Sequence, residues 1–301
     1  MKKIQIIVFF LSSVCSSFGQ TPEPPRLVVG IVVDQMRMEY LYRFESKFGA
    51  GGFKRLMGEG FTLANAHYNY VPTYTGPGHA SIYTGATPAI HGIIGNEYYD
   101  KITRKTVNCV EDSLYKPVGS LTANGKISPS RLLSTTVTDE LKISTQFRAK
   151  VVSMSMKDRG AVLPGGHHPD GAFWYDGKSG QFMTSTYYMM EVPSWVQAFN
   201  DRKMPDQFLL QVWKPLLPIE QYTESGPDES PYERRLVGKP SSAFPYNLPE
   251  LRVRNGNYDL LSLTPFANDL LTEFAIAAVR GEQMGADATP DFLCISYSTP
   301  D

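Results

Sequence analysis

The sequence predicts an α/β fold with a mostly parallel central sheet flanked by helices. Two apolar segments carry this prediction, a continuous Val/Ile run at residues 27–33 and a second run at residues 291–297. Uninterrupted apolar runs are typical of strands that are covered on both faces. Asp34 directly follows the first run, and Asp301 follows the second after three residues. Because α/β sheets carry their functional groups at the carboxyl ends of strands, these two acids are candidates for one site.

Strand and helix patterns alternate between these two runs, as they do in α/β proteins. Gly60 is a helix stop signal, and Gly76-Pro77 suits the first turn of a new helix. In chain order, the expected elements are helices at 36–47 and 51–59, an extended segment at 61–70, a helix from Thr75 to about Tyr83, a helix at 128–141 and a strand at 149–156.

Three further segments complete the expected organisation. Residues 171–186 predict a β-hairpin, because two apolar stretches flank Asp176-Gly-Lys-Ser-Gly. Residues 204–262 are rich in Pro, Tyr, Ser and charge, and we interpret them as an insertion over the sheet. This insertion is either part of a substrate lid or a plain surface excursion. Residues 265–280 show the spacing of an amphipathic helix.

Composition narrows the classes of function. The 301 residues allow one large domain or two small ones, and a hydrophobic content of 42% is ample for a core. The formal net charge of -1 does not indicate a surface for polyanions, so no nucleic-acid partner is expected. No segment after the N-terminus is apolar enough for stable membrane insertion.

The N-terminus has the pattern of a secretory signal peptide. Lys2 and Lys3 precede an apolar stretch at residues 4–11 that is too short to span a bilayer. Ser17-Phe-Gly19 places small residues where signal peptidase needs them, so cleavage is expected before Gln20. An uncleaved anchor is the alternative. We therefore predict a signal peptide at residues 1–19 and a periplasmic or secreted mature protein.

Cys109 and Cys294 remain after this cleavage. An oxidising compartment would allow them to pair, but two cysteines define no disulfide framework. Because Cys294 lies inside an apolar strand pattern, a buried free thiol is the preferred interpretation.

The segment Pro72-Thr-Tyr-Thr75-Gly-Pro-Gly-His79 is the central motif. Gly76 allows close approach of the backbone to a ligand, and the free amides of a helix N-terminus favour an anion. Thr75 lies at this helix start, where its hydroxyl needs a base or a metal to become a nucleophile. Asp34 suggests metal activation. A simpler alternative remains for each residue, because Thr75 and Asp34 are both common helix N-cap types.

Taken together, five segments resemble the alkaline phosphatase superfamily, and specifically the PafA-type, phosphate-irrepressible bacterial alkaline phosphatases. They occur in the family order over nearly the whole mature chain. The segments are Val29-Gly-Ile-Val-Val-Asp-Gln-Met-Arg37, Pro72 to His79, Thr84-Gly-Ala-Thr-Pro-Ala-Ile-His-Gly-Ile-Ile-Gly-Asn96, Ser153-Met-Ser-Met-Lys-Asp-Arg159 and Tyr297-Ser-Thr-Pro-Asp301. The resemblance implies an alkaline-phosphatase-like sandwich, of which residues 20–301 would be the N-terminal portion.

The resemblance also implies a two-zinc site. Asp34 would bind the zinc ion that activates the nucleophile, and Thr75 would attack phosphorus and become a phosphothreonine on the same ion. Asp301 would bind the second zinc ion, which takes the leaving-group oxygen. A pair of metal ions arranged in this way stabilises both the attacking and the leaving oxygen.

Three further residues are expected to hold the phosphoryl group. By the resemblance, Asn96 would donate a hydrogen bond to a phosphoryl oxygen, and Lys157 and Arg159 would contact the non-bridging oxygens. Such charge-assisted contacts stabilise a transferring phosphoryl group. Without the resemblance, Asn96 would pass for a turn residue and the basic pair for a solvated charge cluster.

The predicted function is zinc-dependent hydrolysis of phosphate monoesters through a phosphothreonine. We expect a monomer that acts on small-molecule phosphate esters. The related phosphodiesterase branch is the alternative, since it shares the Asp, Thr and Asn. The family's remaining metal ligands, an Asp-His pair and two further His, would follow Asp301 and are not in this sequence. We therefore interpret the sequence as C-terminally truncated, and a fragment without activity is a third hypothesis.

Overall fold

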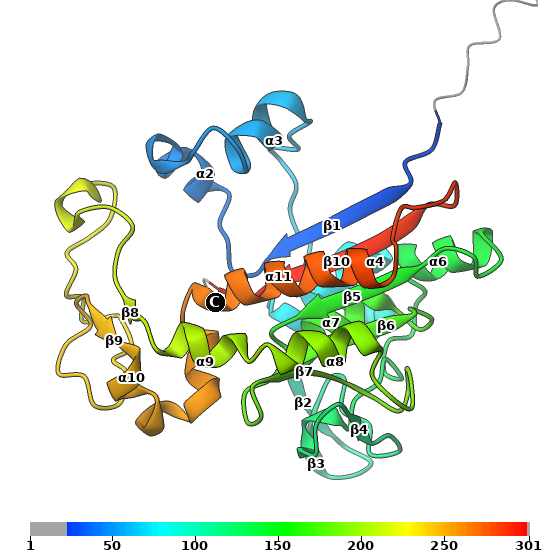
Figure 1. Cartoon of the computed structure of the whole chain (residues 1–301). Coiled ribbons are helices and arrows are strands. Elements are labelled where there is room, and N and C mark those ends of the chain that lie inside the picture. The colour runs from blue at the N-terminus through cyan, green and yellow to red at the C-terminus, as the bar shows by residue number, and fades with distance from the viewer. Residues whose placement is uncertain (1–22, 300–301) are drawn as a thin grey trace, which may run out of the picture.

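The computed structural model describes residues 23–299 of the chain (Figure 1). The predicted signal peptide at residues 1–19 lies outside this range, and so does Asp301. Among the residues that are described, no helix combines the length and the apolar character needed to cross a bilayer.

A six-stranded sheet forms the centre of the described chain and confirms the predicted α/β class (Figure 1). Its first four strands run parallel to one another, and the last two are antiparallel additions. In spatial order the strands are β1 (Leu27–Val33), β10 (Asp291–Tyr297), β5 (Val151–Ser155), β6 (Gly171–Asp176), β7 (Gln181–Ser185) and β4 (Pro117–Val118).

The register of the parallel strands brings distant residues to one edge of the sheet. β10 lies between β1 and β5, and Val33 is opposite Tyr297 at the carboxyl end of the pair. The Asp34 N–H donates to the Tyr297 carbonyl at 2.9 Å, which extends the pairing one residue beyond β1. As a result, the residues that follow β1, β10, β5 and β6 emerge along the same edge.

Helices cover both faces of this sheet. α11 and α8 pack on one face, in front of the sheet in Figure 1, and α4 and α7 pack on the other. The α-helices are α2 (Glu39–Arg43), α3 (Phe53–Glu59), α4 (Thr75–Thr84), α5 (Pro88–His91), α6 (Val137–Ser144), α7 (Asp158–Gly165), α8 (Ser194–Asp201), α9 (Met204–Leu209), α10 (Leu248–Leu251) and α11 (Phe266–Gly281).

Two hydrophobic cores fill the space between the sheet and these helices. In the first, Phe274 of α11 stacks on Phe182 of β7 with ring centroids 3.8 Å apart, and Phe173 of β6 meets Phe274 edge-on. In the second, Val162 of α7 packs with Trp174 of β6 and other buried side chains. The alternating directions of side chains along β6 therefore serve both cores, as expected for a strand buried on both faces.

Smaller elements surround the sheet. Two short antiparallel hairpins are β2 (Glu97–Asp100) with β3 (Lys105–Asn108), and β8 (Val212–Trp213) with β9 (Tyr246–Asn247). The 3₁₀ helices are η1 (Glu45–Lys47), η2 (Ala123–Gly125), η3 (Ile219–Gln221), η4 (Val253–Asn255) and η5 (Asn257–Leu263). The predicted insertion at 204–262 contains α9, α10, β8, β9, η3, η4 and most of η5. Its two interpretations, part of a substrate lid and a plain surface excursion, both stay predictions.

Several predicted elements are confirmed, and two are wrong. The strand at 27–33, the hairpin within 171–186 and the long helix that follows residue 265 are all present. The segment at 61–70 forms turns and no strand. The helix expected at 128–141 begins only at Val137, because a capping box fixes its start: the Thr136 hydroxyl accepts the Asp139 N–H, and the Asp139 carboxylate accepts the Thr136 N–H.

The same Asp139 ties α6 to the segment after α7. One of its oxygens accepts the main-chain N–H groups of His167 and His168, and the other lies 3.0 Å from His167 Nδ1. His167 Nε2 donates to the Leu132 carbonyl, so both ring nitrogens face acceptors. The hydrogen bond to Asp139 raises the pKa of His167 above 6.5. The charged imidazolium is therefore the form that this contact favours.

This contact predicts a pH dependence of stability. The pKa of His167 is higher in the folded protein than in the unfolded chain. The contribution of its contact with Asp139 to the free energy of unfolding is therefore fully present below about pH 6.5, the unfolded pKa, and is lost as pH rises through the folded pKa. We expect His167→Gln to lower the free energy of unfolding by roughly 1–2 kcal/mol below about pH 6.5, and by less at pH values above the folded pKa of His167. Urea denaturation at a series of pH values measures this, with His67→Gln at an exposed histidine as the control. If His167→Gln lowered the free energy of unfolding equally at every pH, the charged form of His167 would not be what its contact with Asp139 stabilises.

Candidate active site

Asp34 and Thr75 form the centre of the candidate site. Asp34 follows β1 at the carboxyl edge of the sheet, and Thr75 is the first residue of α4. The Thr75 hydroxyl donates a hydrogen bond to Asp34 Oδ2 at 2.9 Å. Thr75 is buried to 8% exposure, so its hydroxyl is held in one place. Two residues 41 positions apart in the sequence thus meet as the sequence predicted.

Tyrosine side chains from the preceding segment fix the first turn of α4. Tyr70 donates to the Pro77 carbonyl at 2.9 Å, and Ser81 donates to the Tyr70 hydroxyl. Tyr68 reaches the Gly78 carbonyl at 3.4 Å, and burial is the main reason that its pKa rises to about 12. The helix start is therefore held by the segment that precedes it.

His79 links this helix to the sheet. Because a carbonyl can only accept, Nδ1–H donates to the Thr75 carbonyl at 2.7 Å, and Nε2 then accepts from the Ser296 hydroxyl at 2.7 Å. Burial lowers the pKa of His79 below its usual value, which favours this neutral form. His79 therefore positions Thr75 against β10.

Asn96 approaches the helix start through Gly76. The Gly76 N–H donates to Asn96 Oδ1 at 2.7 Å. Because the amide oxygen accepts this bond, the NH₂ group of Asn96 is the end that can donate to a substrate oxygen. A Cβ atom at position 76 would lie 3.0 Å from Cys109 Sγ and 3.3 Å from Asn96 Oδ1. Glycine is thus needed here for the close approach of Asn96 to the main chain.

Lys157 is the N-cap residue of α7, and Arg159 is the second residue of that helix. Lys157 Nζ lies 3.4 Å from Asp34 Oδ2, and burial lowers the pKa of Lys157 while Asp34 partly offsets this. Arg159 contacts the neighbouring Asp158 at 3.5 Å. Its buried Nε has no hydrogen-bond partner among the residues that the structure describes. A ligand oxygen would satisfy this donor.

Two oxygen donors among the described residues could hold one side of a metal shell. Asp34 and Thr75 present two adjacent oxygen donors, which suit a divalent cation. Residues 23–299 contain no group of three or more His, Cys, Asp or Glu side chains that could hold a metal ion. The third predicted ligand, Asp301, lies outside the described range. The donors that are present therefore fit one side of a metal shell and do not complete it.

The remaining histidines and cysteines have other partners. His91 Nδ1 accepts the Ile93 N–H, and its Nε2 lies 3.0 Å from the Ser81 hydroxyl. His167 is engaged with Asp139, as described above. Cys109 and Cys294 are both buried free thiols, so the preferred interpretation of Cys294 is confirmed.

Sequence reasoning brought Asp34, Thr75, Asn96 and the basic pair to one site, but it missed the residues that support them. The link from His79 to Ser296 and the contact of Asn108 Nδ2 with Asp158 at 3.1 Å were not foreseen. The one available signal was the spacing of His79, four residues after Thr75 on the same helix face.

Comparison with known proteins agrees with this geometry. Residues 28–301 match the family model described as type I phosphodiesterase / nucleotide pyrophosphatase, and the chain belongs to this family. It is 50% identical over 286 residues to alkaline phosphatase PhoV of Synechococcus elongatus, covering 95% of this chain and 52% of that protein. The chain therefore spans about half the length of the curated relatives that it matches.

Solved structures show the same fold. The crystal structure of wild-type alkaline phosphatase PafA superposes with a TM-score of 0.88 at 48% identity, covering 92% of this chain and 53% of that one. A PafA mutant in which a Thr, an Asn, a Lys and an Arg are replaced matches with a TM-score of 0.87 at 46% identity, covering 92% and 54%. These matches confirm the alkaline-phosphatase-like sandwich.

The crowding at Gly76 generates a prediction about the placement of Asn96. Gly76→Ala should lower kcat/KM for a phosphate ester by about tenfold, because the added methyl group displaces the Asn96 amide by a few tenths of an ångström. Steady-state kinetics with the full-length protein measure this change in kcat/KM. Gly78→Ala on the same helix turn is the matched control, since its Cβ would meet only an ordinary contact, 3.4 Å from the Tyr68 hydroxyl. Equal losses in both variants would mean that Asn96 is not held through Gly76.

Proposed function

We propose that this chain provides the nucleophile and the phosphate-binding groups of a zinc-dependent phosphate monoester hydrolase. The observation that carries the proposal is the Thr75 hydroxyl, held 2.9 Å from Asp34 at the N-terminus of a ten-residue helix. A helix N-terminus attracts anions through its free amides and dipole. An acidic partner beside a hydroxyl at such a place suits nucleophilic attack on a phosphoryl group.

The proposed reaction proceeds through a phosphothreonine. Thr75 Oγ bonds to phosphorus as the bond between phosphorus and the ester oxygen breaks. The hydroxyl proton passes along the hydrogen bond to Asp34 and from there to solvent, and the departing alkoxide takes a proton from solvent to become the alcohol. Water then attacks phosphorus, which releases inorganic phosphate and restores the Thr75 hydroxyl.

Zinc is part of the proposal as the group that Asp34 and Thr75 would hold. When bound there, a zinc ion would lower the pKa of the Thr75 hydroxyl and make it nucleophilic near neutral pH. Asp301 is proposed as a ligand of a second zinc ion.

The basic residues support the proposed preference for monoesters. A phosphate monoester carries two negative charges near neutral pH. The Lys157 ammonium lies 3.4 Å from Asp34, and the Arg159 guanidinium, two residues further along the chain, would supply the second positive charge. The NH₂ group of Asn96 adds a neutral donor. Together these groups would compensate the charge on the non-bridging oxygens during transfer.

The relatives support the same proposal. PhoV and PafA are named alkaline phosphatases. The four residues replaced in the PafA mutant are of the same types, in the same order, as Thr75, Asn96, Lys157 and Arg159. On the pattern at residues 1–19, we further propose that the mature protein acts in the periplasm or outside the cell.

Diester hydrolysis is the second candidate, because the family description names phosphodiesterases and nucleotide pyrophosphatases. A diester carries one charge less and needs space for its second alcohol group. The relative contribution of Lys157 and Arg159 to the two reactions therefore distinguishes the candidates.

The first test addresses the nucleophile. In the zinc-loaded protein as its gene encodes it, Thr75→Ala should lose the phosphoenzyme and lower turnover by on the order of a thousandfold or more, because no hydroxyl remains to attack. Thr75→Ser should keep both to a measurable extent. Acid-quenched mass spectrometry detects the covalent phosphoryl group. A phosphoenzyme that persists in Thr75→Ala would assign the nucleophile elsewhere.

The second test addresses the substrate class. Replacing both Lys157 and Arg159 with Ala should reduce kcat/KM for a monoester much more than for a matched diester. Each charge-assisted contact contributes roughly 1.5–3 kcal/mol, so the loss on the monoester should reach at least a hundredfold. Paired kinetics with an aryl phosphate and its methyl diester measure the difference. Equal losses on the two substrates would favour the diesterase.

A further inference from the structure

Two buried serines, Ser155 of β5 and Ser296 of β10, lie side by side near the carboxyl end of the sheet. They are register partners in the parallel pairing of the two strands. Ser155 is 0% exposed and Ser296 is 2% exposed. Burial of a hydroxyl group costs free energy unless the group is hydrogen-bonded. The partners of this serine pair therefore show what the two hydroxyls do.

Ser155 holds the residue that begins α7. Its Oγ accepts the Lys157 N–H at 3.1 Å and donates to the Ser296 carbonyl at 3.0 Å. Because a carbonyl oxygen can only accept, the direction of the second bond is fixed. The Ser298 hydroxyl lies further from Ser155 Oγ, at 3.4 Å. The main chain of Lys157 is thus tied through Ser155 to β10.

Ser296 holds the start of α4. Its hydroxyl donates to His79 Nε2 at 2.7 Å, and His79 Nδ1–H donates to the Thr75 carbonyl at 2.7 Å. A continuous series of hydrogen bonds therefore runs from the Thr75 carbonyl, through His79 and the serine pair, to the Lys157 N–H. The starts of α4 and α7 depend on the same two residues.

Gly160 brings α7 directly onto the serine pair. A Cβ atom at position 160 would lie 2.5 Å from Ser155 Oγ and 2.8 Å from Ser296 Oγ. Both distances are too short for two atoms that are not bonded to each other. Only glycine therefore allows the helix backbone to approach the two hydroxyls so closely.

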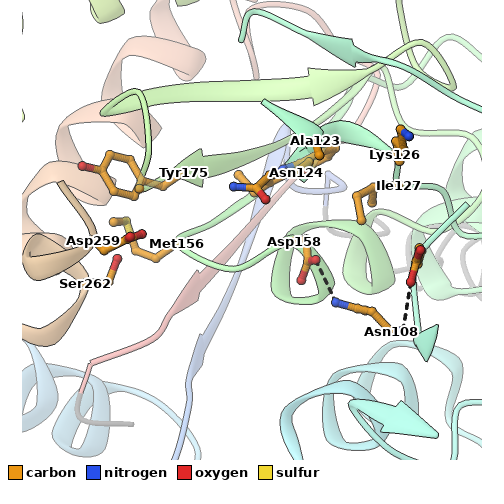
Figure 2. A pocket seen from close by; sticks show the side chains of 13 residues that line it. Asn108, Ala123, Asn124, Lys126, Ile127, Met156, Asp158, Tyr175, Asp259 and Ser262 are labelled. Carbon is orange, nitrogen blue, oxygen red and sulfur yellow. Dashed lines mark hydrogen bonds between the residues drawn. The ribbon is translucent and has the colours of Figure 1, made fainter. Parts of the chain in front are cut away.

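Asn108, the last residue of β3, supports the same turn of α7 in a different way. Its Nδ2 donates to the carboxylate of Asp158, the first residue of α7, at 3.1 Å, and Figure 2 shows this bond as a dashed line. Asn108 thus ties α7 to β3, whereas the serine pair ties α7 to α4. The serine pair is the support that relates Lys157 to Thr75.

We propose that Ser155 and Ser296 are positioning residues for phosphoryl transfer, which set the place of the Lys157 ammonium relative to the Thr75 hydroxyl. Ser155 acts through Lys157, and Ser296 acts through His79 on Thr75 as well as through Ser155. The inference rests on the proposed function, because it assumes that Thr75 attacks phosphorus and that Lys157 contacts a phosphoryl oxygen.

The physical reason is pre-organisation. A charged donor stabilises a transition state only if it already lies where the negative charge develops. Without the Ser155 hydroxyl, the Lys157 N–H loses its acceptor and the first turn of α7 can shift. A displacement of less than one ångström at a reacting group is enough to lower a rate severalfold or more.

A double-mutant cycle tests the proposal in the full-length, zinc-loaded protein. Ser155→Ala should lower kcat/KM for an aryl phosphate about tenfold. In the Lys157→Ala background the same change should cost about twofold or less, because the group through which Ser155 acts is already absent. Ser296→Ala should keep most of its loss in that background, since it also acts on Thr75.

Ser185→Ala is the matched control. Ser185 is the buried last residue of β7, and it repeats the bonding of Ser155. Its Oγ accepts the N–H of Tyr187, two residues further on, at 3.3 Å, and donates to the Ile127 carbonyl at 2.7 Å. Thermal unfolding should show a comparable loss of stability in Ser155→Ala and Ser185→Ala, whereas only Ser155→Ala should lower kcat/KM.

A second variant covers the case in which Ser155→Ala does not yield folded protein. Ser155→Cys keeps a weak donor and acceptor of similar size, and it should show the same difference between the two backgrounds with a smaller loss.

The outcomes separate this inference from the proposed function. If the wild-type protein hydrolyses the ester through Thr75, but the serine variants lose the same factor with and without Lys157, the serine pair has only a structural role and the proposed function stands. The same conclusion follows if Ser155→Ala behaves like Ser185→Ala in kcat/KM. If the wild-type protein forms no phosphothreonine and hydrolyses no phosphate ester, the proposed function is overturned, and this inference with it.

Discussion

The site depends on the parallel pairing of β1, β10 and β5. These strands are far apart in the sequence, yet their register makes their carboxyl ends coincide. Asp34 emerges from β1 and Lys157 follows β5, and the two charged groups meet at 3.4 Å across the end of β10. A slip of one residue in either pairing would turn these side chains to the opposite face of the sheet. The buried apolar residues of β5 and β10 therefore help to determine where the charges lie, whereas no residue of the edge strand β1 is fully buried.

The second requirement is the rigid start of α4. His79 holds the Thr75 carbonyl against Ser296 of β10, and Tyr70 holds the Pro77 carbonyl from the preceding segment. These bonds fix the main chain around Thr75, the proposed nucleophile, from two directions. Pre-positioning of this kind reduces the reorganisation needed when charge develops in a transition state.

The sequence alone predicted the parts of the fold that strong local patterns encode. The apolar run of β1 and the amphipathic spacing of α11 are independent of tertiary context, so both were found close to their observed bounds. The helix expected at 128–141 failed because the Thr136–Asp139 capping box overrides the apolar spacing before it. Segment 61–70 failed because aromatic residues such as Tyr68 and Tyr70 favour strands in isolation, whereas here they serve α4.

The candidate site was predictable for a different reason. Asp34, Thr75 and Asn96 lie in short motifs whose family resemblance extends over most of the chain, and the geometry brings them together. The contact of Asn108 with Asp158 beside them was not predictable, because these two residues meet only through the fold and belong to no local pattern. Contacts of this kind depend on three-dimensional packing, which residue spacing does not record.

A crystal structure of the zinc-loaded protein with vanadate, which mimics a phosphoryl group in transfer, tests the central claim most directly. The account predicts a trigonal bipyramidal vanadate with Thr75 Oγ as one apical ligand. Its equatorial oxygens should contact Asn96, Lys157 and Arg159. Vanadate bound through another side chain, or bound away from the N-terminus of α4, would contradict the assignment of Thr75 as the nucleophile.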